Sequence, residues 1–340
     1  MNQPSQQSDG LFRVAHLSDP HLTSLIGVRR RYLLNKRALG YLFWQLRRRR
    51  EHASDILGAL LHDLSGLALD HIVITGDLTH IGLPSEFQQA RQWLETLGSP
   101  TDVTIVPGNH DAYVRTPWQD TFALWMPYMV SDPELQTEEQ QAPGRSFFPS
   151  TRVRGHVVLI GATSARPSAP FFATGSLGSA QMDRLGDVLD RTRRQGLFRI
   201  LLIHHPLMAA MVGWRKRLTD GAALRTLLAR HGVEMILHGH AHRPSVGYLP
   251  DVGGTIPIIG VPSASARGAE PEQRAAYHVY EVRPSSRGWE VRTSVRGYSP
   301  GNRCFVAGDQ RVIRVPGSAT GLLDTTVYPH SHPIQHGQRA

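Results

Sequence analysis

The sequence predicts an α/β fold, and two observations lead to that prediction. In the first half of the chain, short apolar β-branched runs alternate with longer stretches whose apolar residues repeat at helical spacing. Such alternation implies parallel strands joined by right-handed crossovers. Polar residues also follow several of the strand-like runs directly. Because ligands gather outside the carboxyl ends of parallel strands, we expect these polar residues to share one site.

The composition predicts a folded protein of a reducing compartment. The chain has 340 residues, enough for one large domain or two ordinary ones, and 40% of them are hydrophobic. No apolar stretch approaches the length of a membrane span, and the polar N-terminus lacks the hydrophobic region of a signal peptide. Cys304 is the single cysteine, which excludes an intrachain disulfide and predicts a cytoplasmic location.

Three strands and two helices are expected between residues 11 and 106. The strands are predicted at residues 11–17, 71–75 and 102–106, where apolar runs end in turns. The helices are predicted at residues 53–69 and 84–97, where apolar residues recur every three or four positions. A basic insert at residues 27–50 interrupts this alternation.

The second half continues the pattern and then changes. Residues 118–149 predict a loop with a short helix, and residues 164–178 predict a loop rich in Pro, Ser and Gly. Strands are expected at 152–160, 198–203 and 233–237, with helices at 179–195 and 220–231. After these, runs at 255–261, 277–282 and 289–295 predict antiparallel strands that complete a second sheet.

The predicted organisation is one catalytic domain with short flanking segments. We expect a flexible N-terminus at residues 1–10, a domain at 11–300 that includes the basic insert, and a C-terminal extension at 301–340 that is partly mobile.

Five short motifs at predicted strand ends carry the candidate chemistry. They are Asp19-Pro20-His21, Gly76-Asp77, Gly108-Asn109-His110-Asp111, His204-His205-Pro206 and Gly239-His240-Ala241-His242. Their carboxylate, imidazole and amide groups suit two divalent metal ions, with Mn, Fe, Zn, Co and Ni all compatible. Asp77 is the natural bridging ligand, because one carboxylate can bind both ions. Two ions at short separation can clamp a phosphoryl group and supply hydroxide at neutral pH.

The five motifs, in this order, resemble those of the calcineurin-like metallophosphoesterase superfamily over about residues 11–245. The resemblance implies a four-layer αββα sandwich of two mixed sheets, with a dinuclear centre. It assigns two ligand sets, the first Asp19, His21, Asp77 and His242, and the second Asp77, Asn109, His204 and His240. It also implies in-line attack on phosphorus by a hydroxide that bridges the metals, while His110 contacts the phosphate and protonates the leaving oxygen.

Three assignments of histidine or carboxylate side chains are open or secondary. Either His204 or His205 could be the ligand, and His204 is favoured because it follows the strand more directly. Asp111 is expected to orient His110, the usual role of a carboxylate behind a catalytic imidazole. His80 is expected in an exposed loop.

The residues of the second and third motifs also favour one branch of the superfamily. Gly76-Asp77-Leu78-Thr79 with Gly108-Asn109-His110-Asp111 resembles class III cyclic-nucleotide phosphodiesterases, although those proteins commonly have Asp where His80 stands. An arginine typical of protein phosphatases is missing after the second motif. Hydrolysis of a phosphodiester in a phosphorylated small molecule, such as a 3',5'-cyclic nucleotide, is therefore the leading hypothesis. The alternatives are a membrane-associated hydrolase of a lipid-linked pyrophosphate of the UDP-diacylglucosamine type, a phosphomonoesterase, a nuclease, and a catalytically silent scaffold.

The basic insert has three interpretations. The formal net charge is +9, and nine basic residues with no acidic residue lie between Arg29 and Arg50. Leu39, Leu42, Phe43 and Leu46 predict one apolar face of a helix that Asn35 could cap. Tyr41 and Trp44 widen this face. The favoured interpretation is a helix that covers one flank of the core. The others are an interfacial helix on anionic lipid through residues 29–50, and contact with nucleic acid.

Overall fold

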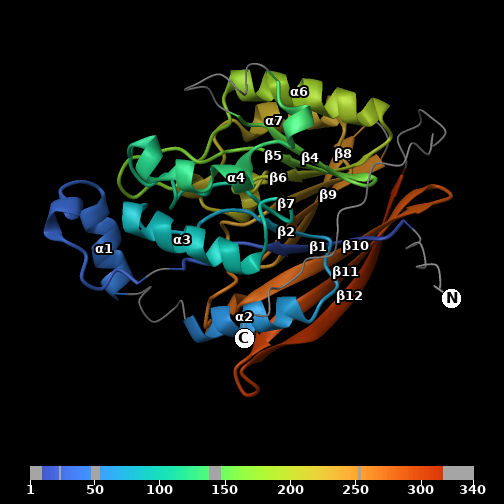
Figure 1. Cartoon of the computed structure of the whole chain (residues 1–340). Coiled ribbons are helices and arrows are strands. Elements are labelled where there is room, and N and C mark those ends of the chain that lie inside the picture. Colours follow the sequence, from blue (N-terminus) through green and yellow to red (C-terminus); the bar gives the residue numbers. More distant parts are fainter. Residues whose placement is uncertain (1–9, 23, 47–53, 138–146, 252–253, 317–340) are drawn as a thin grey trace.

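Two six-stranded mixed sheets pack against each other in the computed structural model, and helices cover their outer faces (Figure 1). The predicted four-layer αββα sandwich is thereby confirmed. The structure describes residues 10–22, 24–46, 54–137, 147–251 and 254–316. Most of the expected flexible N-terminus, Arg47–Arg50 of the insert and the tail beyond residue 316 lie outside these residues.

The first sheet has the strand order β12-β11-β10-β1-β2-β3. Its predicted parallel part is β1 (Phe12–Leu17), β2 (His71–Ile74) and β3 (Val103–Ile105). Helices α2 (Ser54–Ser65) and α3 (Pro84–Leu97) make the crossovers between these strands and cover the sheet.

The antiparallel part of the first sheet extends from the other edge of β1. It comprises β10 (Ala276–Ser285), β11 (Gly288–Ser299) and β12 (Cys304–Pro316). Strand β10 pairs with β1, so the chain returns to the first sheet after leaving the second. We had expected residues 277–282 and 289–295 to complete the second sheet, and this prediction was wrong because β1 offers a free edge for the returning strand.

The second sheet has the order β4-β5-β6-β7-β9-β8. Its strands and covering helices are β4 (Ser150–Arg154), β5 (Val157–Gly161), β6 (Phe198–Leu202), β7 (Met235–His238), β8 (Ser245–Asp251), β9 (Gly254–Gly260), α6 (Ser179–Arg194) and α7 (Gly221–His231). Strands β5, β6, β7 and β9 are parallel neighbours. Strand β9 was expected to be antiparallel to its neighbours. It runs parallel to β7, and it pairs antiparallel only with β8, a strand that the sequence did not predict.

Short helical elements fill the connections. They are η1 (Arg30–Leu33), α1 (Arg37–Leu46), η3 (Trp118–Asp120), η4 (Phe122–Leu124), α4 (Met126–Met129), η5 (Pro133–Leu135), η6 (Ala209–Met211), η7 (Trp214–Lys216) and η8 (Pro271–Gln273). Among the described helices, none combines the length and the apolar character needed to cross a bilayer.

One further prediction needs correction, and one strand was not predicted. Residues 152–160 were expected to form one strand, but Gly155, with φ of 58°, turns the chain between β4 and β5. Residues 304–316 lie in the expected C-terminal extension, where no strand was predicted, and they pair with β11 along its length. The reason is that β12 is an edge strand held by its backbone ladder, so its side chains show no apolar alternation.

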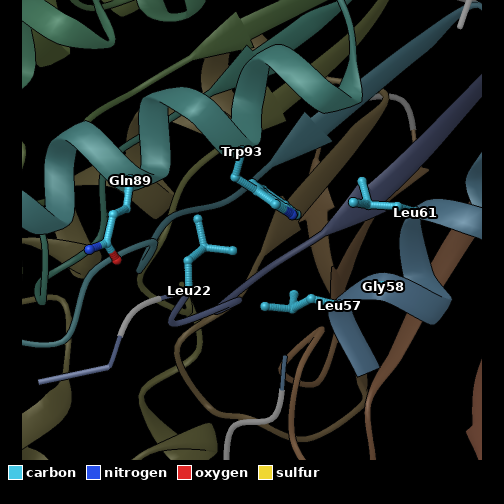
Figure 2. Close-up of a pocket in the computed structure, with 6 residues that line it drawn as sticks. All are labelled: Leu22, Leu57, Gly58, Leu61, Gln89 and Trp93. Carbon is cyan, nitrogen blue, oxygen red and sulfur yellow. The ribbon is translucent and has the colours of Figure 1, made fainter. Parts of the chain in front are cut away.

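The second sheet divides the hydrophobic core into a part between the two sheets and a part beneath α6 and α7. Alternate residues of β6 face opposite sides, with Ile200 and Leu202 packing between the sheets while Leu201 packs toward α6 and α7. A strand buried on both faces reads as a continuous apolar run. On the outer side of the first sheet, an apolar hollow separates α2 from α3 (Figure 2). It is lined by Leu22, Leu57, Gly58, Leu61, Gln89 and Trp93, so it contains no titratable lining group.

A buried ion pair joins β6 to the segment that precedes β7. Arg199 Nε lies 2.7 Å from Glu234 Oε2, and the two side chains are 3% and 5% exposed. The same carboxylate accepts the backbone N–H of Arg199 at 2.8 Å.

We expect Glu234→Gln to lower the free energy of unfolding by about 3–5 kcal/mol, because it leaves the Arg199 charge buried without a partner. Guanidinium unfolding would measure this loss. The matched control is Asp309→Asn, which removes a carboxylate from the exposed Arg311–Asp309 pair and should cost less than about 1 kcal/mol. Equal effects of the two substitutions would contradict the assigned role of the buried pair.

Candidate metal centre

The carboxyl ends of five parallel strands bring the predicted ligands together. Asp19 and His21 follow β1, Asp77 follows β2, and the remaining candidates follow β3, β6 and β7. The two sheets are joined at this edge by hydrogen bonds: His204 Nδ1 donates to the Thr75 carbonyl at 2.6 Å, and the His240 N–H donates to Asp19 Oδ2 at 2.9 Å. All seven predicted ligands therefore lie at one edge of the sandwich.

Left-handed backbone conformations are concentrated in this group. Among the described residues, seven non-glycine residues have positive φ. Five of them are predicted ligands, namely Asp19, His21, Asp77, His240 and His242. Such a conformation strains an L-residue by about 1–3 kcal/mol and persists only where its surroundings enforce it. Strain gathered on the ligand turns indicates that the fold is built to hold these side chains in place.

The first ligand group comprises Asp19, His21, Asp77 and His242, whose ligand atoms lie within 4.8 Å of one another. His21 Nε2 lies 3.4 Å from His242 Nε2. His242 Nε2 also lies 3.1 Å from Asp19 Oδ1. The group is buried except at His242, whose side chain is 24% exposed. It is therefore reached from solvent on the His242 side.

The second group comprises Asp77, His204 and His240, again with ligand atoms within 4.8 Å. His204 Nε2 is its centre, at 3.2 Å from His240 Nδ1 and 3.4 Å from Asp77 Oδ2. Asn109 contributes its side-chain oxygen at 3.1 Å from the same nitrogen. Asp77 belongs to both groups, as a bridging ligand must.

The hydrogen-bond network tests whether these residues fit a cation. His21 Nδ1, His204 Nδ1 and His240 Nε2 each face a backbone carbonyl, which can only accept a proton. When these rings are neutral, as metal ligation requires, the opposite nitrogens point lone pairs at one another. The buried Oδ1 of Asp19 faces a further ring of the site, with His242 Nε2 at 3.1 Å. Clustered lone pairs repel unless a cation lies between them, so the residues fit a metal pair.

Electrostatics lead to the same conclusion. Burial alone would lower the pKa of His204, but the Asp77 and Asp19 carboxylates raise it to about 9. Burial would raise the pKa of Asp19, but His242 and His204 hold it well below its ordinary value. The site thus favours positive charge among its carboxylates, which is the condition for binding divalent cations.

The structure distinguishes the two adjacent histidines after β6. The ring of His204 faces the ligand cluster, as described above. The ring of His205 faces away, with Nδ1 at 2.7 Å from Ser164 Oγ and Nε2 at 3.2 Å from the Ala173 carbonyl. His205 therefore fixes the loop that follows β5 and packs against His240, with ring centroids 4.5 Å apart.

Asp111 does not orient His110 in the way the sequence suggested. Its carboxylate accepts backbone N–H groups from Asp77, Thr79 and Gly108, each at 2.9 Å. Burial and the nearby Asp77 charge raise the pKa of Asp111. Both carboxylate oxygens of Asp111 therefore bind backbone N–H groups of the second and third motifs. In this way Asp111 fixes the turn that carries Asp77.

His110 is positioned by two other groups. Its backbone N–H donates to Asp77 Oδ1 at 2.8 Å, and its Nδ1 lies within hydrogen-bonding distance of the His80 carbonyl. Its ring meets the His21 ring edge-on, with centroids 5.0 Å apart. This arrangement places His110 Nε2 on the edge of the ring opposite the His80 carbonyl.

His80 is buried, contrary to its expected exposed position. It is 2% exposed and stacks on the ligand His21, with centroids 5.1 Å apart. Trp44 of α1 covers it at 6.3 Å, so the basic insert buries this histidine. Ser18 and Ser263 were also overlooked, although both donate to Asp19, at 2.6 Å and 2.7 Å. Ser18 could have been noticed from its place beside the first motif, whereas Ser263 lies too far along the chain.

Comparison with known proteins agrees with this geometry. The family model for calcineurin-like phosphoesterases matches residues 12–244, more than half of the chain. The chain belongs to the calcineurin-like phosphoesterase family. As a calcineurin-like phosphoesterase it is a phosphoric ester hydrolase with a candidate dinuclear divalent-metal site, and the resemblance inferred from five motifs is confirmed.

Two relatives of this calcineurin-like phosphoesterase are named as cyclic-nucleotide phosphodiesterases. A probable cyclic nucleotide phosphodiesterase of Synechococcus is 27% identical over 234 residues, which cover 66% of this chain and 77% of that protein. A cAMP/cGMP dual specificity phosphodiesterase of Mycobacterium tuberculosis is 31% identical over 201 residues, covering 56% of this chain and 54% of that protein. Among solved structures, a dimetal phosphatase from Danio rerio aligns with a TM-score of 0.48 at 12% identity, over 89% of this chain and 99% of that one.

Gly108→Ala tests the packing around the shared carboxylate. A Cβ atom at Gly108 would overlap Asp77 Oδ1 and crowd the Asp77 backbone nitrogen. We expect metal affinity to fall at least about tenfold, as when the support of a metal ligand is lost. Titration with Mn²⁺ after chelation and dialysis would measure it. The matched control is Gly58→Ala in α2, where a Cβ atom meets nothing within 4 Å. Unchanged metal affinity in Gly108→Ala would contradict the assigned geometry.

Proposed function

We propose that this chain hydrolyses phosphodiesters, with 3',5'-cyclic nucleotides as the substrate class, by means of two divalent metal ions. The observation that carries the proposal is that two ligand groups share the carboxylate of Asp77. Asp19, His21 and His242 would complete one metal site. Asn109, His204 and His240 would complete the other.

When bound, such a metal pair polarises phosphoryl oxygens and activates water as a nucleophile. The donor set, with imidazole, carboxylate and amide but no thiolate, supports Mn, Fe, Zn, Co or Ni as the ions. The protein's contribution is to hold the ligands in fixed orientations through the strained turns and the carbonyl contacts of the histidine rings.

His110 is proposed as the general acid. Its neutral ring holds the proton on Nδ1, which faces the His80 carbonyl. When the ring is protonated, Nε2–H donates to the leaving oxygen and stabilises the charge that develops there. The bond from its backbone N–H to Asp77 keeps the acid beside the shared ligand.

The cyclic-nucleotide assignment is supported by the names of both curated relatives and by the Gly76-Asp77-Leu78-Thr79 text. The intact ligand set argues against a silent scaffold, because a scaffold has no need for seven converging ligands. Cys304 as the single cysteine supports a reducing, cytoplasmic setting.

Asp77→Ala should abolish turnover of cAMP and of bis-p-nitrophenyl phosphate in the presence of Mn²⁺, because both metal sites lose a ligand. Initial-rate measurements and metal analysis of the purified variant provide the test. Asp183→Ala, at an exposed position on α6, is the control and should keep full activity. Activity of Asp77→Ala near that of the wild type would refute the bridging assignment.

His110→Ala separates acid catalysis from metal binding. The ribose oxygen that leaves from cAMP needs a proton, so we expect kcat to fall about 10²–10⁴-fold. The p-nitrophenolate that leaves from bis-p-nitrophenyl phosphate is stable without a proton. Its kcat should fall less than about tenfold, while metal content stays unchanged. An equal loss with both substrates would argue against His110 as the general acid.

A further inference from the structure

Exposed apolar side chains gather on three segments beside the metal centre. Helix α1 presents Leu42, Phe43 and Leu46, which are 49%, 46% and 71% exposed. The loop after β5 presents Phe171, and η7 presents Trp214, which are 64% and 60% exposed. We call these five residues the apolar surface. Large apolar side chains grouped in this way mark an interaction site.

Helix α1 uses only part of its predicted apolar face to cover the core. It packs through Trp44, which is 4% exposed and contacts Leu25, Ile81 and Leu83. The insert thus covers one flank of the core, as the favoured interpretation expects, but Leu42, Phe43 and Leu46 remain in solvent. Figure 1 shows α1 at the periphery of the molecule, beyond the end of α3.

Direct contacts hold the three segments together. The rings of Phe43 and Phe171 meet edge-on with centroids 6.5 Å apart, and those of Phe172 and Trp214 do so at 5.3 Å. Lys36 Nζ donates to Ser168 Oγ at 3.0 Å. Phe171 also has a φ of 68°, which an aromatic residue rarely adopts. The fold therefore holds this side chain outward at a cost in backbone energy.

The segments that carry the apolar surface are rich in cationic residues. The three segments, residues 24–46, 165–175 and 208–217, contain no aspartate or glutamate. Their exposed cations are Arg29, Arg30, Arg31, Arg166, Arg215, Lys216 and Arg217. The partner that complements this surface must combine apolar groups with dense negative charge.

We infer that the apolar surface and the exposed cations of the same segments dock this protein onto an anionic lipid bilayer. The apolar side chains would enter the boundary between headgroups and acyl chains, and the cations would contact lipid phosphates. Nucleic acid would satisfy the arginines but leave Leu42 and Leu46 without a suitable contact, because aliphatic side chains do not stack on bases. A second copy of the chain would bring two sets of cations together.

The apolar surface is linked to the metal centre. The Lys216 carbonyl, in η7, lies 2.9 Å from His240 Nε2, and Lys36 lies over the Tyr113 ring at 4.3 Å. Tyr113 in turn stacks on His110 with centroids 5.8 Å apart. Docking would therefore hold the catalytic edge of the sandwich beside the bilayer.

Cosedimentation of the full-length protein with vesicles tests the inference. We expect binding to vesicles that contain phosphatidylglycerol and phosphatidylcholine, and much weaker binding to phosphatidylcholine alone. Phe43→Ser with Phe171→Ser should reduce the partition constant at least about tenfold. Arg29→Gln with Arg30→Gln should reduce it about fivefold per arginine at low salt. The matched control is Tyr248→Ser with Val312→Ser, at similarly exposed positions on β8 and β12, which should bind as the wild type does.

A second readout locates the contact. Trp214 emission should shift to the blue on vesicle binding and be quenched by brominated acyl chains, and Trp214→Phe should lose this response. Circular dichroism and the thermal midpoint of each variant verify folding. Absence of pelleting with anionic vesicles would overturn the inference. So would pelleting that the Phe43/Phe171 variant retains in full, or binding to single-stranded DNA in the absence of any binding to anionic vesicles.

Discussion

The carboxylate of Asp77 lies where the two sheets meet, and the rest of the site depends on it. One oxygen faces the His204 ring from the second sheet, and the other accepts the His110 N–H from the third motif. Its backbone N–H is held by Asp111, and Gly108 leaves the space its carboxylate occupies. The lone pairs of the ligand atoms around Asp77 repel one another, and a pair of cations bound among them would replace this repulsion with attraction. Five ligands accordingly sit on strained turns that the surrounding sheets enforce.

Sequence patterns predicted the parts of the fold in which the burial of side chains follows a regular pattern, either continuous along a strand or repeating along a helix. The parallel strands β1, β2 and β6 are buried except at Arg13 of β1, and α3 was placed at its observed bounds. Edge strands β8 and β12 escaped prediction because backbone pairing holds them while their side chains remain largely exposed. The return of β10 to the first sheet was also beyond the pattern, since pairing partners are decided by free sheet edges.

The candidate site was predictable for a related reason. Parallel sheets bring the residues after each strand to one edge, so motif position and order sufficed to group seven ligands. What position could not give was the environment supplied by distant segments. The burial of His80 depends on Trp44 of α1, and the role of Asp111 depends on the turn beneath Asp77. The helical period of residues 39–46 likewise predicted a helix but not which face would remain in solvent.

Electron paramagnetic resonance of the protein titrated with Mn²⁺ tests most directly whether one carboxylate joins two ions. Two equivalents of Mn²⁺ should bind and give the broad, exchange-coupled spectrum of a bridged Mn²⁺ pair. Saturation at one equivalent, or two equivalents that give only the six-line spectrum of isolated ions, would contradict the bridging role of Asp77.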